Sequence, residues 1–125
     1  MTHNEISGQV VDAALEVHRT LGPGLLESIY EAALAHELRS RGFQVEAQVP
    51  VAVIYKGVEL DIGFRLDLLV EDCVVVELKS VARVEPVHSK QLLTYLKLSE
   101  KHLGLLINFN EPLLKNGLTR LVNGL

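Results

Sequence analysis

Hydrophobic side chains in the first forty residues recur every three to four positions, as they do on one face of an α-helix. The first such stretch begins at Thr2, where Thr2 and Glu5 have the spacing of a capping box. Its apolar positions are Ile6, Val10, Ala13, Ala14, Val17 and Leu21. The Gly-Pro-Gly segment at 22–24 ends this helix. A second helix is predicted over residues 25–41 and stops at Gly42. Its inward positions are Ile29, Ala33, Leu34 and Leu38.

After the second helix the hydrophobic period changes to two, which predicts β-strands. Residues 43–55 form one strand, or two strands interrupted at Pro50, and Lys56–Gly57 predicts a tight turn. The next strand is predicted over residues 58–70, with Gly63 as a bulge or bend within it. Long strands joined by a turn therefore follow the helices.

The last part of the chain alternates between strand and helix patterns. Residues 73–80 are mostly apolar, as in a strand buried on both faces. Residues 85–102 return to helical spacing, with Pro86 in the first turn. The positions expected to touch the sheet are Val87, Leu92, Tyr95 and Leu96. Strands follow at 103–108 and, shorter, at 118–123. The order α-α-β-β-β-α-β predicts an α/β fold with a mixed sheet, because the crossover helix makes the strands it joins parallel.

The composition fits a small soluble protein. Its 125 residues suit one domain spanning 1–125, and 48% of them are hydrophobic, which is enough for a core. Aromatic residues make up only 5%, which argues against binding through rows of stacked rings. The single cysteine, Cys73, excludes an internal disulfide. We expect a cytoplasmic location, because neither a signal peptide nor an apolar run near ~20 residues is present.

Charge is distributed unevenly along the chain. The net charge is -4, which by itself disfavours nucleic-acid binding. From Lys79 onward, however, the chain has seven basic and three acidic residues, so that stretch carries a charge of about +4 and the preceding part about -8. This asymmetry permits an electropositive face above an acidic site.

Three charged residues interrupt the apolar strand segments: Asp67, Glu77 and Lys79. If the hairpin loop is centred on Asp72, Asp67 and Glu77 are directly opposed, with Cβ atoms about 5 Å apart. A two-residue turn at 71–72 would instead put them out of register by one, unless a bulge restored the pairing. Glu77 and Lys79 are two apart on one strand and share a face.

Two carboxylates this close repel each other unless a cation lies between them. A hard cation such as Mg²⁺ or Mn²⁺ suits Asp67 and Glu77, and the Leu78 backbone carbonyl could complete the same set of ligands. Lys79 could then orient a water or neutralise charge on phosphorus. The alternative is structural: Glu77 and Lys79 on an exposed face, with Asp67 capping a loop.

Further polar residues fall on shared helix faces. Glu27 and Tyr30 are three apart on the second helix, and His88, Gln91 and Tyr95 are three and seven apart on the third. Gln and Tyr offer hydrogen-bond donors for phosphate or water, and His can act as an acid or a base. The alternatives are core positions for both tyrosines and a solvated surface position for the histidine.

Gly24, Glu27 and Tyr30 spell Gly-x-x-Glu-x-x-Tyr, and the chain resembles the GxxExxY family of small bacterial proteins within the wider PD-(D/E)XK nuclease superfamily. The segments RLD (65–67), ELK (77–79) and QLLTY (91–95) extend the resemblance over nearly the whole chain. Leu66 stands where the superfamily's name places proline.

The resemblance implies a restriction-endonuclease-like α-β-β-β-α-β core with an extra N-terminal helix. It makes Asp67 and Glu77 metal ligands, Lys79 the catalytic lysine and Glu27 a further residue at the metal. Gln91 and Tyr95 match a Gln-x-x-x-Tyr helix motif that helps hold DNA at the active site in one nuclease branch.

Two functions are consistent with these residues. The first is a Mg²⁺- or Mn²⁺-dependent phosphodiesterase acting on DNA, in which Gln91, Tyr95, Tyr30, His88 and Lys90 contact substrate. The second is a non-catalytic module of the same fold that binds nucleic acid or protein within a larger assembly. A chain this short presents little surface for recognition, so a homodimer or a partner protein could complete the binding groove.

Overall fold

The computed structural model describes residues 1–125, and its first two helices lie where hydrophobic spacing predicts them. Helix α1 (His3–Leu21) begins with the predicted capping box, in which Thr2 and Glu5 exchange two hydrogen bonds of 3.1 Å. Gly22, at φ 73°, ends it. Helix α2 (Glu27–Ser40) follows a five-residue loop. A capping box and a glycine thus set the two ends of α1.

A five-stranded mixed sheet forms the centre of the protein. Its strands, in spatial order, are β1 (Val45–Val51), β4 (Phe64–Val70), β5 (Val74–Lys79), β6 (Leu103–Asn108) and β7 (Leu118–Val122). Neighbours are antiparallel except β5 and β6, which are parallel and joined by helix α3 (Pro86–Ser99). The short helix η1 (Leu114–Gly117) precedes β7. The predicted crossover and its parallel strands are therefore confirmed.

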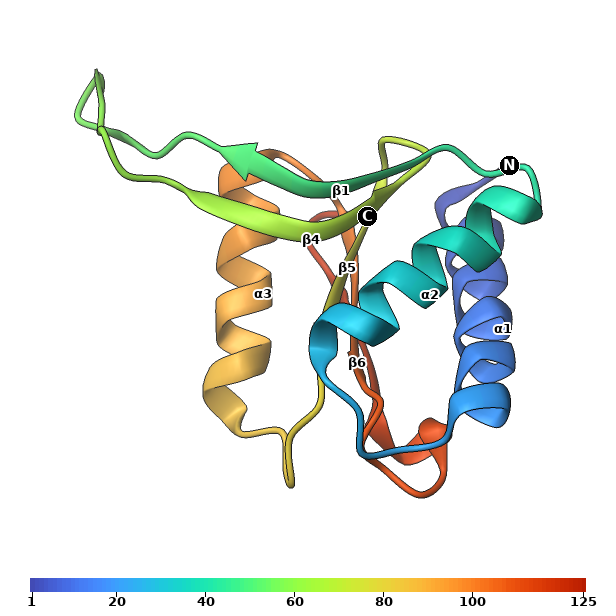
Figure 1. Cartoon of the computed structure of the whole chain (residues 1–125). Coiled ribbons are helices and arrows are strands. Elements are labelled where there is room, and N and C mark those ends of the chain that lie inside the picture. Colours follow the sequence, from blue (N-terminus) through green and yellow to red (C-terminus); the bar gives the residue numbers. More distant parts are fainter.

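Helices cover both faces of the sheet. Figure 1 shows α1 and α2 on one side of β5 and β6, and α3 on the other. The larger hydrophobic core lies under α1 and α2, and a smaller one lies under α3. Two positions predicted to point inward do not: Ile29 is 42% exposed and Val87 is 62% exposed, and each lies in the first turn of its helix. No helix combines the length and apolarity needed to cross a membrane.

In the antiparallel pair of strands β1 and β4, the face on which alternate residues lie changes at Gln48 and Asp67. These two residues face each other in the register but are skipped in its pairing, and Gln48 has φ 53°. On one side of this point Leu68 packs into the core under α1 and α2; on the other side Leu66 packs under α3. In a regular strand, residues two apart share a face. The ribbon is therefore kinked at the position of the predicted site.

The segment predicted as one long strand over 58–70 is interrupted. Strands β2 (Ile54–Tyr55) and β3 (Val58–Glu59) form a separate two-stranded hairpin that extends beyond the main sheet. The predicted turn lies between them. Gly63 joins this hairpin to β4, and a Cβ atom there would lie 2.3 Å from the Val51 carbonyl oxygen. The segments around Gly63 and Val51 approach each other closely, and this close approach, not a bulge, requires glycine at position 63.

Candidate active site

Asp67 and Glu77 lie where β4 and β5 separate. The loop between the strands has three residues, 71–73, and pairing runs from Val70–Val74 to Leu68–Val76. The same register places Asp67 opposite Glu77, as predicted from a loop centred on Asp72. Beyond this point β4 continues beside β1 and β5 beside β6. We call this divergence the strand fork.

The two carboxylates bind backbone groups across the strand fork. The Asp67 N–H donates to Glu77 Oε1 at 3.2 Å, and the Leu78 N–H donates to Asp67 Oδ2 at 2.9 Å. Side chains thereby replace the carbonyl acceptors that a continued ladder would supply. Each carboxylate accepts a hydrogen bond from the backbone of the opposite strand, so the two acids are part of the structure of the sheet.

Burial makes Glu77 electrostatically unusual. The residue is 8% exposed. Burial, together with the charge of Asp67, raises the pKa of Glu77 to about 9, and the charge of Lys79 opposes this increase. Glu77 is therefore protonated at neutral pH unless another cation approaches. Lys79 ends β5, is partly exposed and forms no ion pair, so its ammonium is free to meet a ligand.

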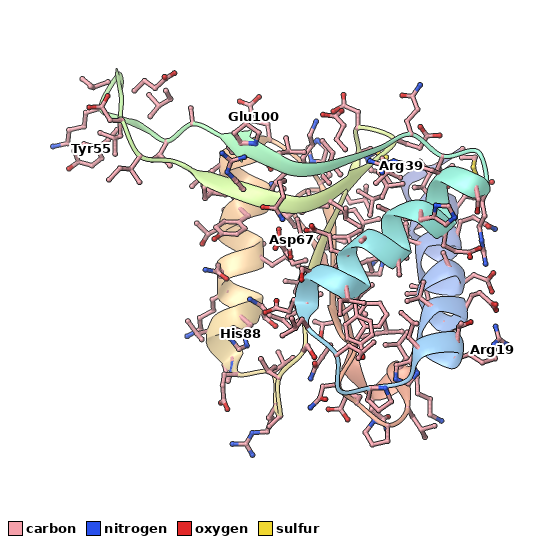
Figure 2. The ribbon with its side chains drawn as sticks, in the orientation of Figure 1. Arg19, Arg39, Tyr55, Asp67, His88 and Glu100 are labelled. Atoms are coloured by element: carbon pink, nitrogen blue, oxygen red, sulfur yellow. The ribbon has the colours of Figure 1, made fainter.

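A pocket of about 210 Å³ opens beside Asp67. Its lining residues are Glu27, Ser28, Glu31, Gln48, Asp67 and Leu78. Glu27 is the first residue of α2, so the start of this helix forms one wall. Figure 2 shows Asp67 between the α2 N-terminus and α3. The predicted juxtaposition of Glu27 with Asp67 is present in the structure.

Three residues of this pocket were not predicted: Ser28, Glu31 and Gln48. Glu31 lies one turn after Glu27 on the same helix face, and Gln48 Nε2 donates to Glu31 Oε1 at 2.6 Å. Burial raises the pKa of Glu31, and the charges of Asp67 and Glu27 also raise it. The four-residue spacing from Glu27 could have revealed Glu31. No sequence signal pointed to Gln48, because its place depends on the kink in β1.

Tyr30 holds the loop before α2 and does not line the pocket. Its side chain is fully buried and stacks on Phe109, with ring centroids 4.6 Å apart. Its hydroxyl donates to the Gly22 carbonyl at 2.5 Å and accepts from the Leu25 N–H at 3.1 Å. The prediction that Tyr30 contacts substrate is therefore corrected, because no surface of its ring is accessible. The Ser80 hydroxyl donates to the Leu25 carbonyl at 2.5 Å and ties this loop to the end of β5.

Helix α3 brings Tyr95 toward the carboxylates. Tyr95 stacks on Phe64 with centroids 4.1 Å apart. Burial raises the pKa of Tyr95, and the Glu77 and Asp67 carboxylates add to the increase. These charges act on the hydroxyl because it lies on the same side of the sheet as Glu77.

The other predicted residues of α3 lie nearer its start. His88 is half-buried, and its Nδ1 accepts from the Glu85 N–H at 3.0 Å, which caps the helix (Figure 2). Lys90 and Gln91 are exposed. One His88 nitrogen is thus committed to structure, whereas the side chains of Lys90 and Gln91 are open to solvent.

The residues at the strand fork suit a hard cation, although their side chains do not surround one point. No three His, Cys, Asp or Glu side chains are arranged to hold one ion together. The donors near Asp67 are nevertheless all oxygens: the carboxylates of Glu27, Glu31 and Glu77 and the Leu78 backbone. Such donors match Mg²⁺ or Mn²⁺. A divalent ion would also give the buried Glu77 the cationic partner that its ionised form needs.

Fold and site together define a restriction-endonuclease-like architecture: a mixed sheet between helices, with carboxylates and a lysine at the fork of two antiparallel strands. The family model described as PD-(D/E)XK nuclease superfamily matches residues 4–121. The chain belongs to this superfamily, and the predicted fold class is confirmed. Comparisons with curated proteins and with solved structures give no significant match.

Proposed function

We propose that this nuclease-superfamily protein is a Mg²⁺- or Mn²⁺-dependent phosphodiesterase that cleaves DNA. The observation that carries the proposal is the strand fork, where Asp67 and Glu77 oppose each other and Lys79 follows on the same face as Glu77. Two acids at this point do not favour a stable sheet, because the buried Glu77 stays protonated beside Asp67 until a cation arrives. Their presence is explained by a ligand that they share.

The pocket residues would divide into ligands and helpers. Asp67, Glu77 and the Leu78 carbonyl would hold the ion, and Glu27 would approach it from α2. The ion would supply Lewis-acid polarisation of the scissile phosphate and a more acidic bound water. Lys79 would orient the attacking water or neutralise charge at phosphorus, because its ammonium has no other partner.

Substrate would lie along α3. Tyr95 has its hydroxyl nearest the carboxylates, and the exposed Gln91 and Lys90 extend the same helix outward. His88 would contact substrate through Nε2, since its Nδ1 is bound to the helix cap. A lysine and amide or hydroxyl donors suit the phosphate backbone.

We further propose that the chain belongs to the GxxExxY branch of the superfamily. Gly24 has φ 97°, which favours glycine, and Tyr30 clamps the loop that ends at Glu27. The three signature positions would therefore act together: two shape the loop, and one places its carboxylate at the pocket.

The test is cleavage of labelled linear and circular DNA with Mg²⁺ or Mn²⁺. Asp67→Asn keeps an oxygen that can accept from the Leu78 N–H, and Lys79→Met keeps a side chain of similar length, so both variants should fold. Each should lower cleavage about 100-fold or more. Lys115→Met, an exposed lysine on η1, is the matched control and should cleave like the wild type.

Equal cleavage by all four proteins would assign the activity to a contaminant. No cleavage by the folded wild type with either ion, on DNA or on labelled RNA, would refute the enzyme and favour the non-catalytic module. Activity on circular DNA would identify internal cutting, whereas activity on linear DNA alone would identify cutting from ends.

A further inference from the structure

Residues 52–63 form a hairpin arm that projects from the end of the β1–β4 ribbon, beyond α3 (Figure 1). Its strands β2 and β3 make a sheet of their own. The Leu60 N–H donates to the Val53 carbonyl at 2.9 Å. Lys56 and Gly57 form the turn with φ of 49° and 81°, the left-handed values that tight hairpin turns require. The arm is therefore a regular hairpin and not an irregular loop.

The arm exposes large apolar side chains that contact little of its own chain. The exposed fractions are 56% for Ile54, 60% for Tyr55, 61% for Val58, 43% for Leu60 and 80% for Ile62. Adjacent strand residues point to opposite faces, so both faces of the arm are apolar. Figure 2 shows Tyr55 at the tip, far from the helices. Five such side chains expose on the order of 500 Å², as much as the largest apolar patch of a typical monomer.

The charges of the arm favour a protein partner over nucleic acid or an anionic membrane. Lys56 lies over the Tyr55 ring, 5.5 Å from its centroid, and the remaining charged residues are Glu59 and Asp61. A net negative arm is repelled by the phosphates of nucleic acid and by anionic lipid. An apolar surface with acidic edges is suited to a protein partner.

The same chain carries a groove in which half of the lining residues are apolar. A cavity of about 360 Å³ lies between the edge strand β1 and the C-terminal end of α3. Its apolar lining is Val49, Val51, Ala52, Leu66, Leu69 and Leu98. Glu46 and Glu100 on its rim are exposed and form no ion pair, so they can meet Lys56 of an incoming arm. β1 also has an unpaired backbone edge, which can accept a further strand.

We propose that the arm of one molecule docks in this groove of a second copy, and reciprocally, so that the protein is a two-fold homodimer. Two arms of about 500 Å² and the two surfaces they cover would bury roughly 2,000 Å², which lies within the range of stable dimers. The inference uses none of the residues assigned to the active site, and its test reads oligomeric state, not cleavage.

The experiment measures molar mass by sedimentation over a wide range of concentration. The wild type should be a dimer. Ile62→Asp in the arm and Leu98→Asp in the groove should each weaken association about 30-fold or more, because a charge enters an apolar contact. Leu113→Asp, at a leucine whose exposure lies between those of Leu98 and Ile62 and which lies outside both surfaces, is the control and should leave the dimer intact. Circular dichroism and thermal unfolding confirm that each variant is folded.

Mixing gives a sharper test. The Ile62→Asp chain has an intact groove and the Leu98→Asp chain an intact arm, so the mixture should recover one arm–groove contact and dimerise where neither variant does alone. A wild type that is monomeric throughout would overturn the proposal. So would a dimer unaffected by Ile62→Asp, or a mixture that gains nothing over its components.

Discussion

Glu77 makes a specific prediction for the pH dependence of stability without divalent ions. In the unfolded chain its pKa is near 4.5, whereas in the folded protein burial raises the pKa to about 9. A folded state that holds the extra proton is favoured fully below the unfolded value, and this contribution is lost as pH rises from 4.5 to about 9. The wild type should therefore become less stable across neutral pH.

The slope follows from proton linkage. Between about pH 6 and about pH 8, folded Glu77 keeps one proton that the unfolded chain has released, and each pH unit costs about 1.4 kcal/mol. The loss over this interval is about 3 kcal/mol, or about 10 °C in melting temperature for a domain of this size. Glu77→Gln keeps a neutral side chain of the same shape, so its stability should lack this part of the slope.

The assay is urea unfolding in the presence of EDTA at several pH values, for the wild type and Glu77→Gln. Contributions that the two proteins share cancel in the difference between their curves. Glu46→Gln, at an exposed carboxylate on β1, should run parallel to the wild type. Parallel curves for the wild type and Glu77→Gln would refute the reasoning, because Glu77 would then be ionised and compensated in the folded protein.

Three further predictions follow from contacts at and near the site. Mg²⁺ should raise the melting temperature of the wild type near pH 8 but not that of Asp67→Asn, as scanning calorimetry would show; equal shifts would place the ion elsewhere. Tyr30→Phe leaves the Gly22 carbonyl and the Leu25 N–H unpaired, so it should cost about 1–3 kcal/mol in urea unfolding and reduce DNA cleavage by displacing Glu27. Gly63→Ala should destabilise the protein by about 1–3 kcal/mol in urea unfolding, because its Cβ would lie 2.3 Å from the Val51 carbonyl oxygen. Gly8→Ala, in open space on α1, should stabilise it by up to about 1 kcal/mol. The opposite order of stability would contradict the packing described.

Periodicity and capping predicted the helices well, because these signals are local. The capping box at Thr2 and the glycine at 22 lie within one turn of the boundaries they set. The opposition of Asp67 and Glu77 also followed from local information, since hairpin register depends on the centre of its loop. Local signals thus located the acids but not their surroundings.

What sequence reasoning missed depends on contacts between distant segments. The kink that brings Gln48 to Glu31 needs two strands to deform together, and no spacing within either strand encodes it. Tyr30 shares a helix face with Glu27, yet it stacks on Phe109, which is 79 residues away in the sequence, and is a core residue. After the break in the strand, Gly63 lies so close to Val51 across the ribbon that a Cβ atom would meet the Val51 carbonyl oxygen. Each is a tertiary effect that overrides a local pattern.

The strand fork implies a conflict between stability and activity. Apolar residues in place of Asp67 and Glu77 would let the β4–β5 ladder close by another pair and would remove two carboxylates from a low-dielectric site. Selection for stability alone would therefore erase the acids. If the proposed activity is correct, substitutions at this position that stabilise the protein would also abolish its cleavage of DNA.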